Sequence, residues 1–374
     1  MTHSDLPLAG ARQELGSVNF PLGWLLDNGA QPIQYRATIE VARLHLPDRA
    51  RFHVLPHAFP PAVTLAVTQD RNGTWGNRML SAPSRGESLQ GAGTIVAVRR
   101  LLEYGWDADS PPLLRARRLL FRLLAEDDDP AYGFELVPRK GADAAAVHRA
   151  RATLREAAAA TLAQAGYEKD PRLRGAATRI VDRLGAFLAS PLASEPLVRV
   201  GNQRALAPEA APPSIYSLIM LAYMPLFRTE RYEVMDRLAQ YLSQGAPRTA
   251  PAILVGKELL PVPHLLLGDP LPSTSVADAD VPWALTWLEL IARLGFLRRS
   301  NTWEHVLDRF LNDCDASGIW HARKGATTAP RSANPFTWPS FPLEPHATGE
   351  ARWTDVTFRV GLIARLSGRQ VNLT

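Results

Sequence analysis

Two stretches of the chain share one turn motif, Gln69-Asp70-Arg71-Asn72-Gly73-Thr74-Trp75 and Asp313-Cys314-Asp315-Ala316-Ser317-Gly318-Ile319-Trp320. In both, a helical stretch ends, a polar residue precedes Gly, and a small or β-branched residue separates Gly from Trp. A third, degenerate copy runs from Glu126 to Phe134 and has Phe in place of Trp. Recurrence of one turn far apart in a chain indicates a fold built from repeated units.

The repeated unit is a pair of helices, because apolar residues recur at helical spacing between the turns. The expected pairs are residues 33–44 with 60–67, 94–104 with 113–124, 146–165 with 172–189, 213–224 with 231–242 and 281–297 with 302–311, and a last helix covers 355–366. Asp170-Pro171 marks one helix start as an N-cap followed by Pro. Asn301 and Glu304 are spaced as a capping box at another. The first helices of successive units begin about 55 to 72 residues apart.

The connections between the pairs are long, Pro-rich and irregular, notably residues 192–213, 245–280 and 325–352. Six units with such connections favour a closed ring of inner and outer helices over an open solenoid. The sequence therefore predicts an all-α protein, an (α/α)6 toroid of about six helical hairpins. It forms a single domain over residues 1–374, with residues 1–30 as an N-terminal extension. Short strand-like pieces, Arg51 to Leu55 and Glu135 to Pro138, are expected to form surface hairpins.

The two Trp residues of the turns have an expected packing role. Each is predicted to fill the gap between neighbouring units, with its indole N–H capping a carbonyl at the C-terminus of a helix.

Composition narrows the class of protein. The 374 residues are 46% hydrophobic and 21% charged, as in soluble globular proteins. The net charge of +5 is spread along the chain without a basic run, so no nucleic-acid partner is expected. No apolar run reaches the ~20 residues of a membrane span. Cys314 is the only cysteine, and the N-terminus lacks the features of a signal peptide, which predicts a cytoplasmic protein. Nothing in the sequence indicates an oligomeric state.

The turns resemble the Gln-Trp repeats of squalene and oxidosqualene cyclases, in which an aromatic-Leu pair and Gln precede Gly-x-Trp. Phe310-Leu311 supply that pair in the second copy. The chain is similar to members of the α/α-toroid superfamily, which contains terpenoid cyclases (squalene-hopene cyclase-like) and protein prenyltransferase β subunits. The stretch Gly23 to Arg36 resembles the start of short, single-toroid bacterial proteins described as squalene-cyclase-like or prenyltransferase-like. Shared fold does not transfer chemistry.

The resemblance implies an isoprenoid-handling enzyme, a single-toroid terpene cyclase that protonates an alkene to start a carbocation cascade. The family's acid motif, Asp-x-Asp-Asp, matches Asp278-Ala279-Asp280-Val281. Asp280 then takes the place of the proton donor, with Asp278 and Asp355 as supports. Val281 departs from the motif, since the family has Asp there. The residues alone also fit a structural interpretation, in which Asp280 is an N-cap and the tryptophans that follow belong to the core.

A ligand cavity is expected at the mouth of the ring, toward which the N-terminal ends of the inner helices point. An aromatic wall with a few convergent polar groups is the usual form of such a site, and aromatic rings stabilise cationic intermediates. The predicted cavity residues are Tyr216, Trp283, Trp287, Trp353, Tyr35 and Arg36. Each of the aromatic side chains can equally be a core residue.

No metal site is predicted. Protein prenyltransferases hold zinc with Asp, Cys and His, but Asp355 stands where the resemblance places the His, and Cys314 lies in a structural turn as a small buried residue. A metal site from Glu344, His346, His264 and Asp269 is conceivable, yet their spacing is not diagnostic of Mg or Zn. We therefore expect no cofactor.

Two further functions fit the same pattern. One is a non-catalytic toroid that binds a hydrophobic ligand or a partner protein, which the incomplete acid motif and the missing zinc ligands favour. The other is a carbohydrate-active (α/α)6 barrel, which uses two carboxylates across a cleft.

Overall fold

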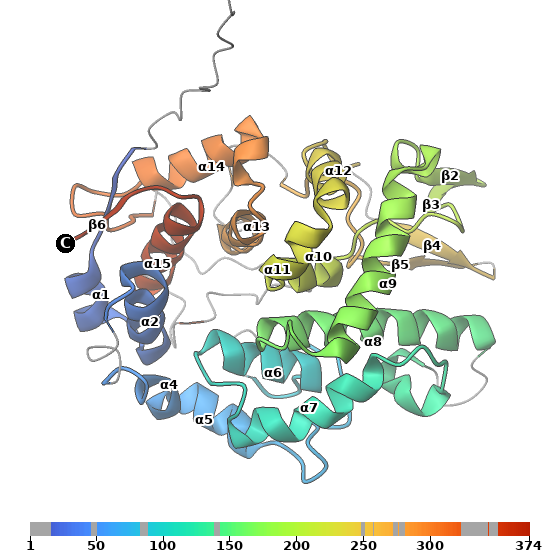
Figure 1. Cartoon of the computed structure of the whole chain (residues 1–374), viewed down its shortest axis with the longest axis horizontal. Coiled ribbons are helices and arrows are strands. Elements are labelled where there is room, and N and C mark those ends of the chain that lie inside the picture. Colours follow the sequence, from blue (N-terminus) through green and yellow to red (C-terminus); the bar gives the residue numbers. More distant parts are fainter. Residues whose placement is uncertain are drawn as a thin grey trace, which may run out of the picture.

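The computed structural model describes residues 16–45, 51–82, 89–137, 143–247, 251–256, 258–271, 276, 281–322, 343 and 351–374. Within these residues the protein is mostly helical, with fourteen α-helices and three small two-stranded sheets (Figure 1). In the same part of the chain, no helix combines the length and the apolar character needed to cross a membrane.

The predicted helices are present within a few residues of their expected bounds. The α-helices are α1 (Leu22–Asn28), α2 (Gln31–Arg36), α4 (Leu55–Ala58), α5 (Pro60–Val67), α6 (Thr94–Glu103), α7 (Pro111–Leu123), α8 (Ala144–Gln164), α9 (Pro171–Leu188), α10 (Ile215–Ala222), α11 (Pro225–Glu230), α12 (Tyr232–Leu242), α13 (Val281–Leu294), α14 (Asn301–Asn312) and α15 (Ala351–Leu366). A π-helical segment, η1 (Ala37–Ala42), continues α2, and a short 3-10 helix, η6 (Leu297–Arg299), connects α13 to α14.

The first helices of the pairs contact one another in succession. Helix α6 contacts α8, α8 contacts α10, α10 contacts α13, and α13 contacts α15. Helix α15 in turn contacts η1 and α2 near the start of the chain. In Figure 1 the chain passes from α1 and α2 through α4 to α9, then α12 and α14, and returns to α15 beside α1.

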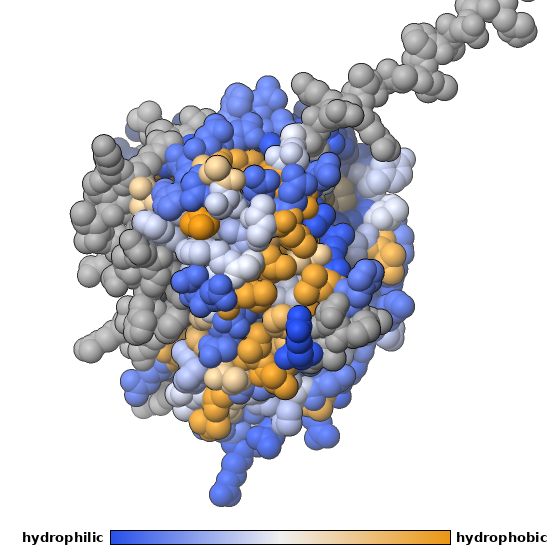
Figure 2. Space-filling view, turned by 90° about the vertical axis from the view of Figure 1, so that its left-hand side faces the viewer, coloured by the Kyte–Doolittle hydropathy of each residue, from blue (hydrophilic) through white to orange (hydrophobic). Residues whose placement is uncertain are grey.

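The two ends of the described chain are joined by a parallel sheet. Strand β1 (Val18–Phe20) pairs with β6 (Val371–Leu373), with Asn19 opposite Asn372. Residues expected to form an N-terminal extension therefore contribute a strand and helix α1 to the folded body. Figure 2 shows the side of the molecule that carries α1, α2 and β6, where hydrophobic residues form a band between hydrophilic ones.

Four of the strands lie in the long connections 192–213 and 245–280, and none lies in the described part of the segments where strands were predicted. Antiparallel hairpins are formed by β2 (Leu197–Val200) with β3 (Gln203–Leu206) and by β4 (Ala252–Val255) with β5 (Glu258–Pro261). The predictions for 51–55 and 135–138 are wrong over the described residues, which form turns leading into α4 and a 3-10 helix, Phe134–Leu136. The two observed hairpins have a Gly at the turn with φ of +60° and +62°, which the segments 51–55 and 135–138 lack.

Two N-caps were predicted, and the structure has the one at the start of α9 but not the one at the start of α14. The Asp170 carboxylate accepts the backbone N–H of Arg172 at the start of α9, which confirms that N-cap. The capping box at Asn301 is wrong, because Asn301 is already the first residue of α14 and Ser300 occupies the N-cap position.

The two Gly-x-Trp turns have the same geometry. In the first, the amide N–H of Asp70 donates to the Thr74 carbonyl (2.8 Å), and Gly73 has a φ of +87°. In the second, the N–H of Asp315 donates to the Ile319 carbonyl (2.9 Å), and Gly318 has a φ of +92°. Glycine is favoured at both positions because side chains strain this left-handed backbone.

Each turn is joined to the first helix of a neighbouring pair by its Trp. The backbone N–H of Trp75 donates to the Thr94 hydroxyl at the start of α6, and that of Trp320 donates to the Thr357 hydroxyl in α15. The Trp75 indole N–H donates to the Leu65 carbonyl in the last turn of α5 (2.8 Å), which confirms the predicted cap. The degenerate copy is not the same turn, because Gly133 has a φ of −84° and Phe134 takes the positive φ instead.

Close packing of α8 and α10 forms one side of the core. Residues Ala157 to Ala160 of α8 are fully buried, and every residue of α10 is buried. Small side chains let two helices approach closely, and a helix that is apolar all round lies inside a protein. One connected cluster of buried hydrophobic residues forms the main core, and its members come from the whole described chain, from Phe20 near its start to Val371 near its end.

Replacing the turn glycine Gly318 by Ala is expected to lower the free energy of unfolding by about 2 to 4 kcal/mol. The added Cβ would lie 2.2 Å from the Asn19 carbonyl oxygen, so β1 must shift in addition to the cost of the left-handed φ. Gly76→Ala is the matched control, since Gly76 has a φ of +60° but no described atom within 4 Å of the place that a Cβ would take, and we expect a loss of about 1 kcal/mol. Urea unfolding of both variants tests this, and equal losses would contradict it.

Candidate functional site

Four pairs of opposite charges lie on four helical segments in the interior of the protein. We call the group the ion-pair network; its members are Arg36 of α2 with Glu40 of η1, Arg100 with Glu103 of α6, Glu289 with Arg293 of α13, and Asp355 with Arg359 of α15. The partners in each pair are three or four residues apart, which places both side chains on one face of the helix. The four guanidinium groups and four carboxylates balance in formal charge.

Ion pairs between helices centre on Glu289. Its carboxylate lies 2.9 Å from Arg293, 3.3 Å from Arg359 and 3.6 Å from Arg36. Arg293 also contacts Glu40 at 2.9 Å, so α13 is tied to α15, α2 and η1. Charge-assisted hydrogen bonds of this kind have a fixed geometry and therefore fix the relative positions of the helices.

The pKa values in the network show which carboxyl groups stay ionised. Burial by itself raises the pKa of Glu40, but Arg36 and Arg293 outweigh it and lower that pKa to about 2. Burial likewise opposes the charge of Glu103, and Arg100 lowers its pKa. Burial lowers the pKa of Arg100 to about 10, which leaves its guanidinium protonated at neutral pH. Glu40 and Glu103 are therefore ionised at neutral pH and have no proton to donate. Their low pKa values also make them weak bases.

Two of the predicted site residues, Asp355 and Arg36, belong to this network. Asp355 is fully buried, and its carboxylate accepts from Arg359 Nε (2.8 Å) and from the backbone N–H of Leu343 (3.2 Å). Arg36 and Asp355 are linked through Glu289 and Arg359, which lie between them in the network. The expected acid Asp280 and its neighbour Asp278 lie outside the described residues.

The predicted aromatic residues form several separate contacts. Trp283 and Trp287 of α13 lie with ring centroids 6.1 Å apart, and Trp287 contacts Trp303 of α14 edge to face at 6.5 Å. Trp287 and Trp303 are fully buried, so this group packs α13 against α14. The Trp303 indole N–H donates to the Asp269 carboxylate (2.9 Å).

The other three aromatic side chains contact a different histidine each. Tyr35 lies against His53, Tyr216 against His264 and Trp353 against His321, with centroid separations of 5.7, 6.3 and 4.7 Å. The common aromatic cavity therefore stays a prediction; among its predicted residues, Trp283 and Trp287 contact each other.

The described residues contain no group of three or more potential metal ligands. Asp269, one of the four residues considered for a metal, is used by the Trp303 indole and by the backbone N–H of Leu271. Glu344 and His346 lie outside the described residues. Burial raises the pKa of Cys314 to about 12, so this thiol is neutral at physiological pH. The side chain is half-buried rather than buried as predicted.

A pocket that the sequence did not indicate lies beside the N-terminus of α10. We call it the hairpin pocket; it has a volume of about 290 Å³ and lies among α8, α9, the start of α10 and the β4–β5 hairpin. Its apolar wall includes Ile180, Leu184, Pro212, Ile253, Val262 and Leu265. The wall combines segments from distant parts of the chain, so no local periodicity could have identified it.

The polar edge of the hairpin pocket is formed by an interlocked helix cap. The Ser214 hydroxyl accepts the N–H of Ser217 (2.9 Å), and the Ser217 hydroxyl accepts the N–H of Ser214 (3.0 Å). Ser214 also donates to the Glu156 carboxylate, which forms an ion pair with Arg183. The spacing Ser214-x-x-Ser217 is the sequence signal for this edge, because reciprocal capping marks the start of a helix, here α10.

His264 completes this edge as a neutral side chain. Burial lowers its pKa to about 4, so the imidazole is uncharged at neutral pH. Its ring faces the predicted cavity residue Tyr216. Ser214, Glu156 and His264 thus line one pocket. The Ser214 hydroxyl donates to Glu156 and accepts the N–H of Ser217 in the helix cap. These bonds give the hydroxyl a structural role rather than the role of an activated nucleophile.

Comparisons of the chain with models of protein families, with curated proteins and with solved structures gave no match. The resemblance to α/α-toroid proteins therefore rests on the sequence motifs alone.

Removing one cation from the ion-pair network is expected to be strongly destabilising. Arg359→Met leaves the fully buried Asp355 without its ion pair, and such uncompensated charges cost about 3 to 5 kcal/mol. The exposed pair Arg237–Glu233 supplies the control, because Arg237→Met is expected to change stability by less than about 0.5 kcal/mol. Urea unfolding measures both. Adding Asp355→Leu to Arg359→Met should recover part of the loss, and no recovery would show that charge is not the cause.

The lowered pKa of Glu40 predicts a specific dependence of stability on pH. A carboxyl group with a folded-state pKa of about 2, against an ordinary value of 4.5, stabilises the fold above pH 4.5 and loses that contribution as the pH falls toward 2. The stability difference between the wild type and Glu40→Gln should therefore be largest near pH 7 and shrink below pH 4.5. Glu233→Gln, at an exposed pair, should show little difference at any pH. A Glu40→Gln difference that stays constant down to pH 3 would contradict the assignment.

Proposed function

We propose that the chain is an (α/α)6 toroid that binds a small ligand with an apolar body and does not catalyse a reaction. Support for the closed arrangement comes from the successive contacts of α6, α8, α10, α13 and α15, and from the contact of α15 with α2. Pairing of β1 with β6 joins the ends of the same arrangement.

The observation that carries the binding proposal is the composition of the hairpin pocket. Its lining combines an apolar wall with a smaller number of polar side chains, as in small-molecule sites. The volume of about 290 Å³ lies at the lower end of the usual range, so a short isoprenoid chain suits it better than one of thirty carbons.

The charges in the interior favour binding over acid catalysis. A terpene cyclase or a glycosidase needs a carboxylic acid that is protonated at working pH. Arginine neighbours lower the pKa of Glu40 and Glu103, so these carboxyl groups are ionised rather than protonated at neutral pH. Asp355 forms an ion pair with Arg359. Acid-initiated cyclisation remains a prediction that depends on Asp278 and Asp280.

Filling the hairpin pocket should abolish ligand binding. Ala152 of α8 lines the pocket, and Ala152→Trp is expected to weaken the binding of geraniol or farnesol at least about tenfold, because the indole takes the place of the ligand. Ala145→Trp, at an exposed position of the same helix outside the pocket lining, is the matched control and should bind as the wild type does. Titration calorimetry measures both, and equal affinities would reject this pocket as the site.

A turnover assay separates binding from catalysis. The protein and its Asp280→Asn variant are incubated with linear C10 to C30 isoprenoids and their diphosphates, and products are analysed by mass spectrometry. We expect no product from either protein. Product that forms with the wild type and is lost in Asp280→Asn would replace the binding proposal by a cyclase.

A further inference from the structure

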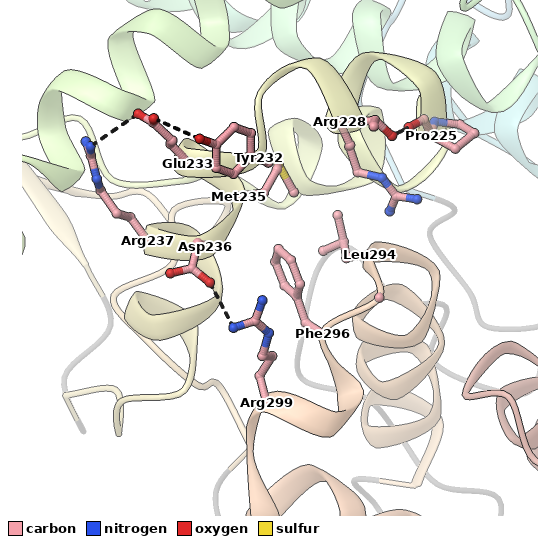
Figure 3. A pocket seen from close by; sticks show the side chains of 12 residues that line it. Pro225, Arg228, Tyr232, Glu233, Met235, Asp236, Arg237, Leu294, Phe296 and Arg299 are labelled. Carbon is pink, nitrogen blue, oxygen red and sulfur yellow. Dashed lines mark hydrogen bonds and ion pairs between the residues drawn. The ribbon is translucent and has the colours of Figure 1, made fainter. Parts of the chain in front are cut away.

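A second, larger pocket lies on the other side of α12, away from the hairpins. We call it the outer pocket; it has a volume of about 660 Å³ and is open to solvent between α11, α12, the end of α13 and η6 (Figure 3). Its floor is apolar, since Met235, Leu294 and Phe296 line it and are at least nine-tenths buried. Tyr232, which is 69% exposed, stands at the rim. An apolar floor with polar side chains around it fits a small molecule with an apolar body.

Arg228 is the half-buried cation of this pocket. Its Nη1 donates to the Arg293 carbonyl in the last turn of α13, which accounts for one of the five N–H groups of the guanidinium. Burial lowers the pKa of Arg228, and the charge of Glu168 only partly opposes this effect. Among the described residues no carboxylate lies within ion-pair distance of it. Arg228 therefore brings to the pocket a positive charge that forms no ion pair with a described carboxylate.

The two other arginines of the pocket are occupied. Arg299 contacts Asp236 at 2.8 Å, and Arg237 lies 3.9 Å from Glu233. Figure 3 shows Arg228 and the Arg299–Asp236 pair on opposite sides of Leu294 and Phe296. Of the three arginines that line the pocket, Arg228 is the one for which no ion pair with a described carboxylate is found.

We propose that the outer pocket binds an aromatic carboxylate, with its carboxylate on Arg228 and its ring system on Leu294 and Phe296. The planar guanidinium can offer two parallel N–H groups, which match the two oxygens of a carboxylate. The partly desolvated position strengthens that bond, and the apolar floor excludes ligands that lack an apolar body. A neutral amide of the same shape cannot accept two charge-assisted hydrogen bonds and is rejected.

Titration calorimetry with 2-naphthoate, 2-naphthamide and acetate tests the proposal. We expect 2-naphthoate to bind at least about tenfold more tightly than 2-naphthamide, because a hydrogen bond to a charged group contributes that much or more. Acetate should bind far more weakly, since it lacks the ring system. Equal binding of naphthoate and naphthamide, or no binding of naphthoate, would overturn the proposal.

Two variants locate the site. Arg228→Gln should remove the preference for naphthoate over naphthamide, whereas Arg298→Gln, at an exposed position outside the pocket lining, should keep it. Because Arg228 also caps α13, its replacement can affect folding, so Thr229→Trp serves as an independent variant. Thr229 is exposed and lines the pocket, and a Trp there should block naphthoate while the contact of Arg228 with α13 persists. Unchanged naphthoate binding in Thr229→Trp would place the ligand elsewhere and reject the outer pocket.

Discussion

Glu289 joins α13 to α2 and α15, because its carboxylate contacts Arg36 on α2 and Arg359 on α15 as well as Arg293 on its own helix. Buried charges are costly unless they are paired with good geometry, and here each one has an opposite charge one helical turn away. The π-helical segment after α2 carries Glu40, which adds a further contact to Arg293. Ion pairs between helices thus constrain the relative positions of α2, η1, α13 and α15.

Around this group the remaining structure is fixed by close apolar contacts. The alanine face of α8 admits the wholly buried helix α10, and the two Gly-x-Trp turns hydrogen-bond to Thr94 and Thr357. The Gly318 turn lies against β1, so the last pair of helices is joined to the beginning of the chain. Both pockets lie where pairs meet their connections, at the start of α10 and at the end of α13.

These two pockets differ in the chemistry that they offer. In the hairpin pocket Ser214 and Arg183 are both bonded to Glu156, and apolar side chains form most of the remaining wall. In the outer pocket Arg228 brings a charge that no described carboxylate neutralises. The occupants that we propose, an apolar ligand and an aromatic carboxylate, therefore differ in the same way as the two pockets do.

The sequence by itself determined the helices and the Gly-x-Trp turns. Their signals are local, because helical periodicity, an Asp170-Pro171 cap and a glycine at positive φ depend on a few neighbouring residues. The sequence also singled out Arg36, as a residue of the predicted ligand cavity, and Asp355, as a support of the predicted acid. Only the tertiary structure decided that these two residues belong to one ion-pair network, that Trp287 packs on Trp303, and that strands lie in the long connections. Such outcomes depend on contacts between residues far apart in the chain, as between Arg36 and Glu289, and local pattern carries no information about which distant side chain will supply a partner.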